Sequence, residues 1–167
     1  NSKRGGEKMI VNLRVDERLI HGQVVTNWLK YLGVKYVVVA NDRAAKDEIQ
    51  KMSLSMAVPS SIKCLIIDVD TAIEVLGDSR SKDKKMMVIC GNLTDVIRIT
   101  DKIKDIEEIN IANYGNLADG AMDRKIINKA LRCNEEEMQY IREITKTGLT
   151  VINQPLPANP KKSLKNL

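Results

Sequence analysis

The chain contains one histidine, His21, and this residue lies in a short segment rich in charged side chains. Residues 14–24 read RVDERLIHGQV, with two arginines and two acidic residues beside the histidine. The unperturbed pKa of histidine is about 6.5, so a neutral imidazole is available as a nucleophile near neutral pH. An imidazole nitrogen can take up a phosphoryl group and release it again, because the P–N bond is labile. The segment therefore favours reversible phosphoryl transfer onto His21.

The residues on both sides of His21 have the groups that a phosphate dianion requires. Arg14 and Arg18 carry planar guanidinium groups with several N–H donors. Gly22 has no Cβ to obstruct a close approach of the backbone. The amides of Gly22 and Gln23 are expected to open a helix, and the N-terminus of a helix attracts anions. We predict that these four residues bind the phosphate.

Two acidic residues, Asp16 and Glu17, precede the histidine. One of them is expected to hold the imidazole through its second nitrogen and so to fix the tautomer that attacks. A purely structural alternative remains open, in which His21 caps the helix or fills the loop and the arginines pair with the two acids. The position of the segment and its arginines favours function without excluding that alternative.

Short apolar runs alternate with segments of helical period along the chain. Strands are predicted over 9–15, 36–40, 62–67, 86–90, 108–112, 125–131 and 149–153, and helices over 24–32, 45–56, 70–76, 94–104 and 135–146. The near-continuous Val and Ile runs are typical of strands buried on both faces of a sheet. The alternation predicts an α/β fold, with a single doubly wound, mainly parallel sheet flanked by helices on both faces.

In such a sheet, ligands bind beyond the carboxyl ends of the strands, where the strand order reverses. The His21 segment follows the first strand and so belongs to this edge. Within the helix predicted over 45–56, one face carries Ala45, Ile49, Met52 and Met56. Most of the seven methionines, these included, are expected to fill the core. The loop over 113–120 contains glycine and has no clear period, and the sequence assigns it no role.

The 167 residues and the formal net charge of +5 indicate one globular domain that suits anionic partners. We expect this domain to cover residues 9–167, after a disordered or non-native leader over 1–8, with Met9 the natural start. No apolar stretch approaches the roughly 18 residues that cross a bilayer. The three cysteines are far apart and lack CxxC spacing, which is typical of a reduced, cytoplasmic protein.

The string RVDERLIHGQV at residues 14–24 resembles the signature of the IIB components of the mannose/fructose/sorbose family of the bacterial phosphoenolpyruvate-dependent sugar phosphotransferase system. The similarity continues through Trp28 and the Asn92-x-Thr94-Asp95 turn and covers residues 9–167. One departure is the sequence NYGN at residues 113–116, where relatives often have a Gly-Gly pair. This departure leaves the contribution of the loop to a phosphate site open.

The resemblance implies a protein-N(pi)-phosphohistidine–sugar phosphotransferase. His21 would take a phosphoryl group on Nδ1 from the phosphohistidine of a IIA protein or domain. It would pass the group to a sugar of the mannose, fructose or sorbose type during transport by membrane IIC and IID components. Arg14 and Arg18 would contact the phosphate and Asp16 would orient the loop. The protein would be cytoplasmic and peripherally associated with the transporter.

Other classes have less support from the residues. A non-catalytic α/β sensor module could bind a phosphorylated ligand on the same loop without covalent chemistry, and an acid-labile adduct would distinguish the two. A glycine-rich nucleotide motif is lacking, and one histidine with dispersed cysteines does not form a metal site, so neither cofactor nor metal is expected. The basic run with Lys82, Lys84 and Lys85 is expected to be a solvated loop, and no nucleic-acid partner is predicted.

Overall fold

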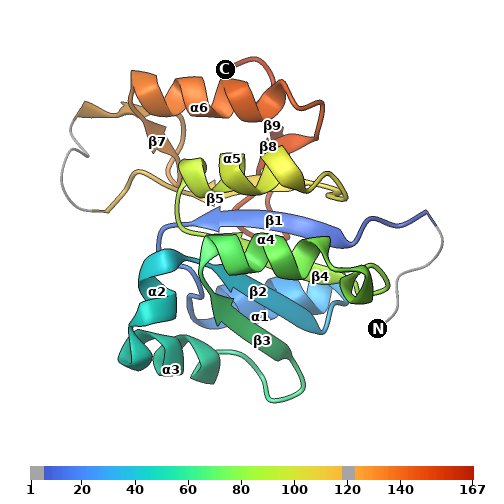
Figure 1. Ribbon diagram of the computed structural model, residues 1–167. Coiled ribbons are helices and arrows are strands. Elements are labelled where there is room, and N and C mark those ends of the chain that lie inside the picture. Colours follow the sequence, from blue (N-terminus) through green and yellow to red (C-terminus); the bar gives the residue numbers. More distant parts are fainter. Residues whose placement is uncertain (1–5, 118–122) are drawn as a thin grey trace.

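Seven strands form one central sheet in the computed structural model, which describes residues 6–117 and 123–167 (Figure 1). In spatial order they are β3 (Lys63–Ile67), β2 (Tyr36–Ala40), β4 (Met86–Cys90), β1 (Ile10–Asp16), β5 (Ile109–Asn113), β8 (Val151–Asn153) and β9 (Lys162–Ser163). Every pairing is parallel except that of β8 with β9. The mainly parallel sheet predicted from the sequence is confirmed.

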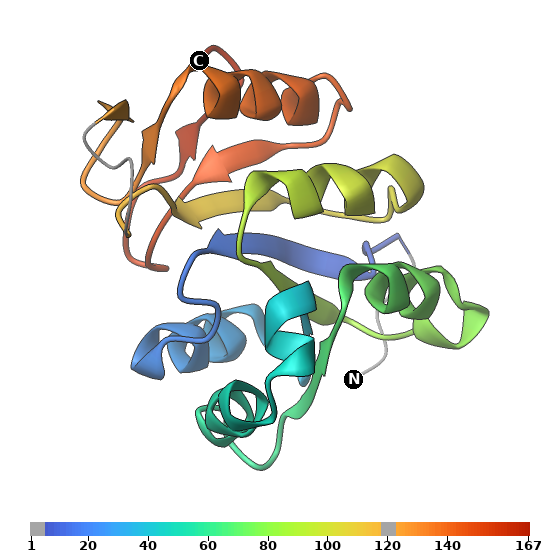
Figure 2. The ribbon, with the colours of Figure 1, turned by 60° about the vertical axis from the view of Figure 1, so that its left-hand side comes forward.

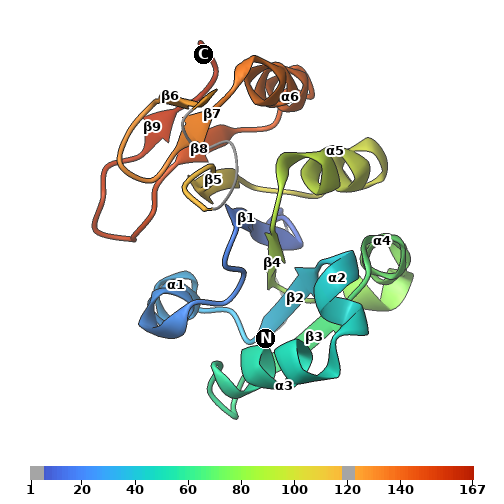
Figure 3. The same ribbon diagram turned by 90° about the vertical axis from the view of Figure 1, so that its left-hand side faces the viewer.

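The helices cover both faces of this sheet. Among the described residues they are α1 (Gly22–Leu32), α2 (Asp42–Lys46), α3 (Glu48–Met56), α4 (Val69–Gly77), α5 (Leu93–Lys102) and α6 (Glu135–Thr145), with a short 3-10 helix, η1 (Ser79–Ser81). Figure 3 looks onto the carboxyl ends of the strands, with α1 on one face and α4, α5 and α6 on the other. A separate antiparallel pair, β6 (Lys125–Ile126) with β7 (Arg132–Cys133), lies outside the main sheet.

The apolar core is divided by the sheet into two clusters, because successive side chains of a strand point to opposite faces. In β4, Val88 packs in the cluster beneath α4, α5 and α6, whereas Met87 and Ile89 pack in the cluster beneath α1. In β1, Leu13 and Val15 belong to the first cluster. The alternate residues of β1 that face α1 are polar and buried: Asn12, Arg14 and Asp16.

The strand order reverses at β1. From β1 the chain continues to β2 and β3 on one side of the sheet, and β5 and β8 follow on the other side. Figure 2 shows β1 in the middle of the sheet and the turn that leads from it to α1. A polar residue at the end of β1 therefore lies where doubly wound sheets bind their ligands.

The helix predicted over 45–56 differs from the structure. Asp47 interrupts it, and its carboxylate accepts the N–H groups of Ile49 and Gln50, so that α2 ends and α3 begins anew. The new helix has turned its expected core face outward, with Met52 65% and Met56 78% exposed. The prediction that these methionines fill the core is therefore wrong.

Two further differences concern the C-terminal part of the chain. The strand predicted over 125–131 is limited to the two residues of β6, and β9 was not expected. Residues 1–5 of the expected leader, and residues 118–120 of the loop over 113–120, lie outside the described residues.

Candidate functional site

The turn from Glu17 to His21 connects β1 to α1 at the carboxyl edge of the sheet. Leu19 adopts a left-handed backbone conformation, with φ at 60°, which is uncommon for a large side chain. Its side chain and that of Ile20 are buried in the cluster beneath α1. These two anchors compensate the unfavourable backbone conformation and leave the next residue, His21, on the surface.

His21 occupies the N-cap position of α1, but its imidazole does not cap the helix. Only its backbone carbonyl contributes, accepting the N–H of Val24 at 3.2 Å. Among the described residues, the imidazole makes no hydrogen bond and is exposed. The part of the structural alternative in which the ring serves as a cap is therefore not what the structure shows. Its other part, the pairing of the arginines with an acid, is seen, because Arg14 and Arg18 both contact Asp16.

Gly22 and Gln23 form the first turn of α1, and both are exposed. Gly22 has a φ of 47°, whereas a Cβ added there would meet no atom within 4 Å. This backbone conformation favours glycine, and the expected close approach of a phosphate to the backbone at Gly22 stays a prediction. Within the described part of the chain, the amides of both residues lack a protein acceptor, so they are available to an anion beside His21.

The second arginine, Arg18, lies in the turn with its side chain 36% exposed. Its backbone N–H donates to Oδ1 of Asp16 at 3.0 Å, and its Nε reaches the same oxygen at 3.4 Å. These two contacts anchor the inner part of the side chain. In the described residues, the outer fork of Nη1 and Nη2 has no partner, and the fork matches the geometry of a phosphate group.

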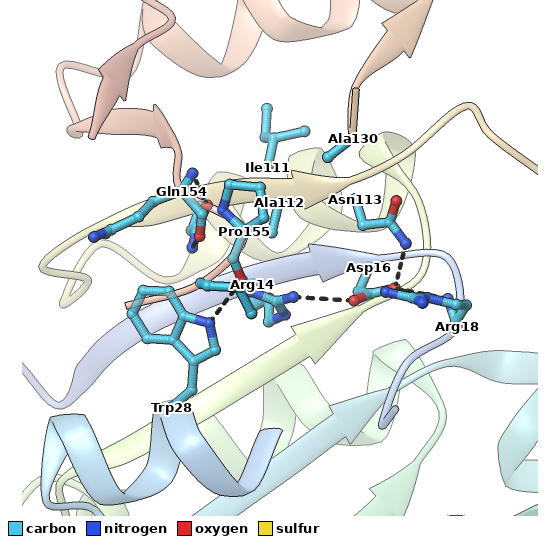
Figure 4. Close-up of polar contacts among 12 residues, drawn as sticks. Arg14, Asp16, Arg18, Trp28, Ile111, Ala112, Asn113, Ala130, Gln154 and Pro155 are labelled. Atoms are coloured by element: carbon cyan, nitrogen blue, oxygen red, sulfur yellow. Dashed lines mark hydrogen bonds and ion pairs between the residues drawn. The ribbon is translucent and has the colours of Figure 1, made fainter. Parts of the chain in front are cut away.

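The first arginine, Arg14, has a different environment, because its side chain is only 1% exposed (Figure 4). Nη2 donates to Oδ2 of Asp16 at 3.1 Å and Nη1 donates to the carbonyl oxygen of Pro155 at 3.1 Å. The guanidinium also lies 5.8 Å from the ring centre of Trp28, whose indole N–H donates to the same Pro155 oxygen. Burial lowers the pKa of Arg14, and the neighbouring Asp16 opposes that effect. The expected contact of Arg14 with phosphate is thus replaced by contacts inside the protein.

The Asp16 carboxylate is completely buried and is the centre of this network. Besides the two arginines, Nδ2 of Asn113 donates to it at 3.2 Å. Glu17 also has other partners, since its Oε2 accepts the N–H groups of Asn116 at 3.0 Å and Leu117 at 3.1 Å. The expectation that one of these carboxylates holds the imidazole is contradicted by these contacts.

The contacts of Glu17 attach a segment that the sequence left without a role, residues 113–117. The backbone N–H of Glu17 donates to the carbonyl oxygen of Asn113 at 3.0 Å, so the two segments are joined twice. Gly115 has a φ of 83°, and a Cβ at this position would overlap the carbonyl oxygen of Arg132. An isolated glycine in a loop of polar residues was the one signal of this close approach in the sequence.

A polar hollow of about 370 Å³ borders the other side of the turn. Its walls come from the turn itself, from the segments that follow β2 and β4, and from α3: Glu17, Leu19, Asn41, Asp42, Arg43, Gln50, Gly91, Asn92 and Asp95. Burial and the nearby Asp42 raise the pKa of Asp95. The guanidinium of Arg98 pairs with Asp42 at 3.4 Å and with Asp95 at 3.4 Å, so these acids are already engaged.

The groups that surround His21 are therefore donors and cations. The acids nearest to the turn are buried or already accept hydrogen bonds, whereas the Arg18 fork and the first amides of α1 face outward. Such an arrangement can stabilise an anion that is bound to the imidazole. Residues 6–117 and 123–167 contain no group of three or more His, Cys, Asp or Glu side chains that could hold a metal ion. Their helices also include none long and apolar enough to cross a membrane.

A family model for the sorbose subfamily IIB component of the PTS system matches residues 10–167. A probable phosphotransferase enzyme IIB component of Streptococcus pyogenes is 41% identical over 161 residues, which are 95% of this chain and 99% of that protein. The mannose-specific EIIAB component of the PTS system in Escherichia coli strain K12 is 27% identical over 160 residues. That match covers 95% of this chain but only 48% of the relative's length.

A solved structure supports the same similarity at the level of the fold. The IIBSor domain of the sorbose permease from Klebsiella pneumoniae superposes with a TM-score of 0.85 and is 25% identical in sequence. The superposition covers 94% of each chain.

Proposed function

Because this chain belongs to the sorbose subfamily of IIB components of the phosphotransferase system, we propose that it carries a phosphoryl group on His21. The donor is the phosphohistidine of a IIA protein or domain. The acceptor is a sugar of the mannose, fructose or sorbose type, transported by membrane IIC and IID components. A relative named as an EIIAB component supports the IIA partner. The observation that carries the proposal is an exposed imidazole without a hydrogen bond in the described residues, in the same short turn as Arg18, whose outer fork has no partner there either.

The chemistry is two successive transfers of one phosphoryl group. In the first, the lone pair of Nδ1 of His21 forms a bond to phosphorus while the P–N bond of the donor breaks, and that electron pair returns to the donor imidazole. In the second, a sugar hydroxyl oxygen attacks phosphorus, the bond to His21 breaks, and the hydroxyl proton passes to the released imidazole. Both steps proceed by positioning and charge stabilisation.

The residues around His21 divide this work between them. The outer fork of Arg18 and the amides of Gly22 and Gln23 bind the phosphoryl oxygens, whose charge they stabilise through the transfer. Asp16 fixes the inner part of the Arg18 side chain, so that the fork faces outward. Arg14 balances the buried charge of Asp16 and acts as a positioning residue behind the site.

We further propose that residues 9–167 form one IIB domain that works in the cytoplasm and associates peripherally with the membrane components. The charged residues at the surface and the lack of a membrane-spanning helix in the described ranges are compatible with this arrangement. A sensor that binds a phosphorylated ligand without covalent chemistry remains the alternative. The unengaged imidazole favours transfer over that alternative, because a binding site alone does not require a nucleophile.

The deciding experiment is incubation of the purified protein with a phosphorylated IIA protein, followed by intact mass measurement. We expect one phosphoryl group on the wild-type chain, lost again in acid, and none on a His21→Ala variant that keeps its fold by circular dichroism. Reversible binding of a sugar phosphate without an acid-labile adduct would favour the sensor. An unchanged mass after incubation with an active donor would refute the carrier function.

A further inference from the structure

The helix α3 carries an apolar stripe that the fold does not use. Ile49, Met52 and Met56 are 84%, 65% and 78% exposed, and their spacing of three and seven residues places them on one side of the helix. Leu54, on the opposite side, is buried in the cluster beneath α1. Among the described residues, no other helix exposes more than one large apolar side chain. We call these three residues the α3 stripe.

The α3 stripe borders the site that contains His21. Gln50, the neighbour of Ile49 in sequence, lines the same polar hollow as Glu17 and Leu19 of the turn. In Figure 3, which looks onto the carboxyl ends of the strands, α2 lies across the turn from α1, and α3 lies below α2 at the β3 end of the sheet. The stripe, the hollow and the turn are thus neighbouring parts of one edge of the molecule.

We propose that the α3 stripe is a docking surface for the protein that donates its phosphohistidine to His21. This inference rests on the proposed function, since it names the contact surface for the partner of that reaction. Transfer from one imidazole to another requires the two rings to approach along a line through phosphorus. The surface around the donor histidine must therefore lie against the carboxyl edge on both sides of His21.

An interface of ordinary size around His21 would extend beyond the turn and could include the α3 stripe. A specific complex buries about 800 Å² of each partner, or about 20–30 residues. The turn over 17–21 is far smaller than this, so the contact must extend onto neighbouring elements. One side is the start of α1, and the other side is the hollow followed by α3. Exposed apolar side chains within such a footprint are the ones whose burial stabilises the complex.

The chemistry of the α3 stripe suits a carrier that must bind and release its partner. Methionine side chains are flexible and adapt to differently shaped surfaces. Ile49 adds a stiff, branched anchor at the end of the stripe nearest the hollow. The stripe supplies a small apolar contact, and the exposed Arg18 in the turn supplies the charge that attracts a phosphohistidine.

The test compares two phosphoryl donors on two variants. The first variant carries Ile49→Gln, Met52→Gln and Met56→Gln, which remove the apolar surface but keep side-chain length and add no charge. The matched control, Tyr31→Gln, removes a side chain that is 62% exposed in the last turn of α1, at the end of the helix remote from His21. The donors are a phosphorylated IIA protein and phosphoramidate, a small molecule that needs no docking surface.

For the triple variant we expect the IIA concentration at half-maximal rate to rise about tenfold or more. Labelling of His21 by phosphoramidate should remain within about twofold of wild type, and the Tyr31→Gln control should match wild type with both donors. An unchanged half-maximal concentration would overturn the docking proposal while the proposed function stands. Equal slowing with phosphoramidate would also overturn it, because the stripe would then act through the site itself. Slowing confined to the onward step, with membrane vesicles and sugar, would assign the stripe to the membrane components instead.

Failure of the proposed function has a different signature. In that case the wild-type chain would take up no phosphoryl group from the phosphorylated IIA protein, whatever residues occupy α3, even where phosphoramidate labels the exposed imidazole.

Discussion

Arg14 and Asp16 form an ion pair of 3.1 Å in which both side chains are excluded from solvent. The two residues are separated by one position on β1, and side chains at this spacing project from the same face of a strand. That face is covered by α1, so the pair is enclosed between the sheet and Trp28. The same carboxylate also contacts Arg18 at the surface. Asp16 thereby connects the interior of the protein to the candidate phosphate-binding fork.

The buried pair predicts a large loss of stability when only one partner is removed. Arg14→Met would leave a charged Asp16 without its buried partner and the Pro155 oxygen with one donor fewer. We expect the free energy of unfolding to fall by about 3–5 kcal/mol. The double variant Arg14→Met/Asp16→Asn should recover part of this loss, because it leaves no unpaired buried charge. Urea unfolding measures both values. A loss below about 1 kcal/mol for Arg14→Met would show that the pair behaves like an exposed one.

Replacing Arg18, unlike replacing Arg14, should change the free energy of unfolding little and the rate of phosphoryl transfer strongly. Arg18→Ala removes the outward fork and one contact of 3.4 Å, at a side chain that is 36% exposed. The free energy of unfolding should therefore change by about 0.5 kcal/mol or less, whereas the single-turnover rate of phosphoryl transfer should fall at least about tenfold. Arg80→Ala is the matched control, since Arg80 is 87% exposed and pairs with Asp78 in η1. Wild-type rates in Arg18→Ala would remove this residue from the phosphate site.

The sequence predicted the layers of the fold because most strands are buried on both faces and read as plain Val and Ile runs. It predicted the place of His21 because the charged segment follows the first strand, and ligand-binding loops of such sheets lie at the carboxyl ends of the strands. The two arginines could not be separated by residue type. What distinguishes them is their position relative to β1. Arg14 lies within the strand and its side chain points to the face covered by α1, whereas Arg18 follows the end of the strand.

The remaining differences from the sequence predictions have two causes, one local and one tertiary. Apolar residues at helical spacing predicted a buried face over 45–56, but Asp47 caps a new helix and changes its direction. The segment 113–117 had no periodicity to interpret, because its conformation depends on hydrogen bonds from distant residues. Its anchor is the Glu17 carboxylate, which is about a hundred positions earlier in the chain. Contacts of this kind are tertiary and leave no pattern in the sequence around either partner.

Replacement of Gly115 or Gly22 by alanine should lower the free energy of unfolding by different amounts. Gly115→Ala would place a Cβ against the backbone oxygen of Arg132 in addition to a φ of 83°, so the backbone must move. Gly22→Ala meets open space, and only its φ of 47° is unfavourable. We expect a loss of about 1–2 kcal/mol for Gly22→Ala and a clearly larger loss for Gly115→Ala, both measured by urea unfolding. Equal losses would mean that the segment over 113–117 yields to the added methyl group.

The Glu137 carboxylate predicts how stability depends on pH. Burial alone raises the pKa of Glu137, but hydrogen bonds from Arg124 and from the backbone N–H of Asn134 outweigh it, and the net pKa is lowered from the usual 4.5. A carboxyl group with a lowered folded-state pKa stabilises the protein above its unfolded-state pKa, and this contribution is lost as the pH falls through the folded-state value.

Glu137→Gln mimics the protonated side chain, so the variant should be less stable than wild type at neutral pH. The difference should shrink on acidification and approach zero once the pH lies below the lowered folded-state pKa of Glu137. Urea unfolding at a series of pH values measures this convergence. Glu136→Gln is the matched control, because Glu136 occupies the same first turn of α6 but, within the described part of the chain, its carboxylate accepts a hydrogen bond only from the exposed Tyr140 hydroxyl. A constant difference between wild type and Glu137→Gln at every pH would show that the residue acts through packing. The charge that links α6 to Arg124 would then have no part in stability.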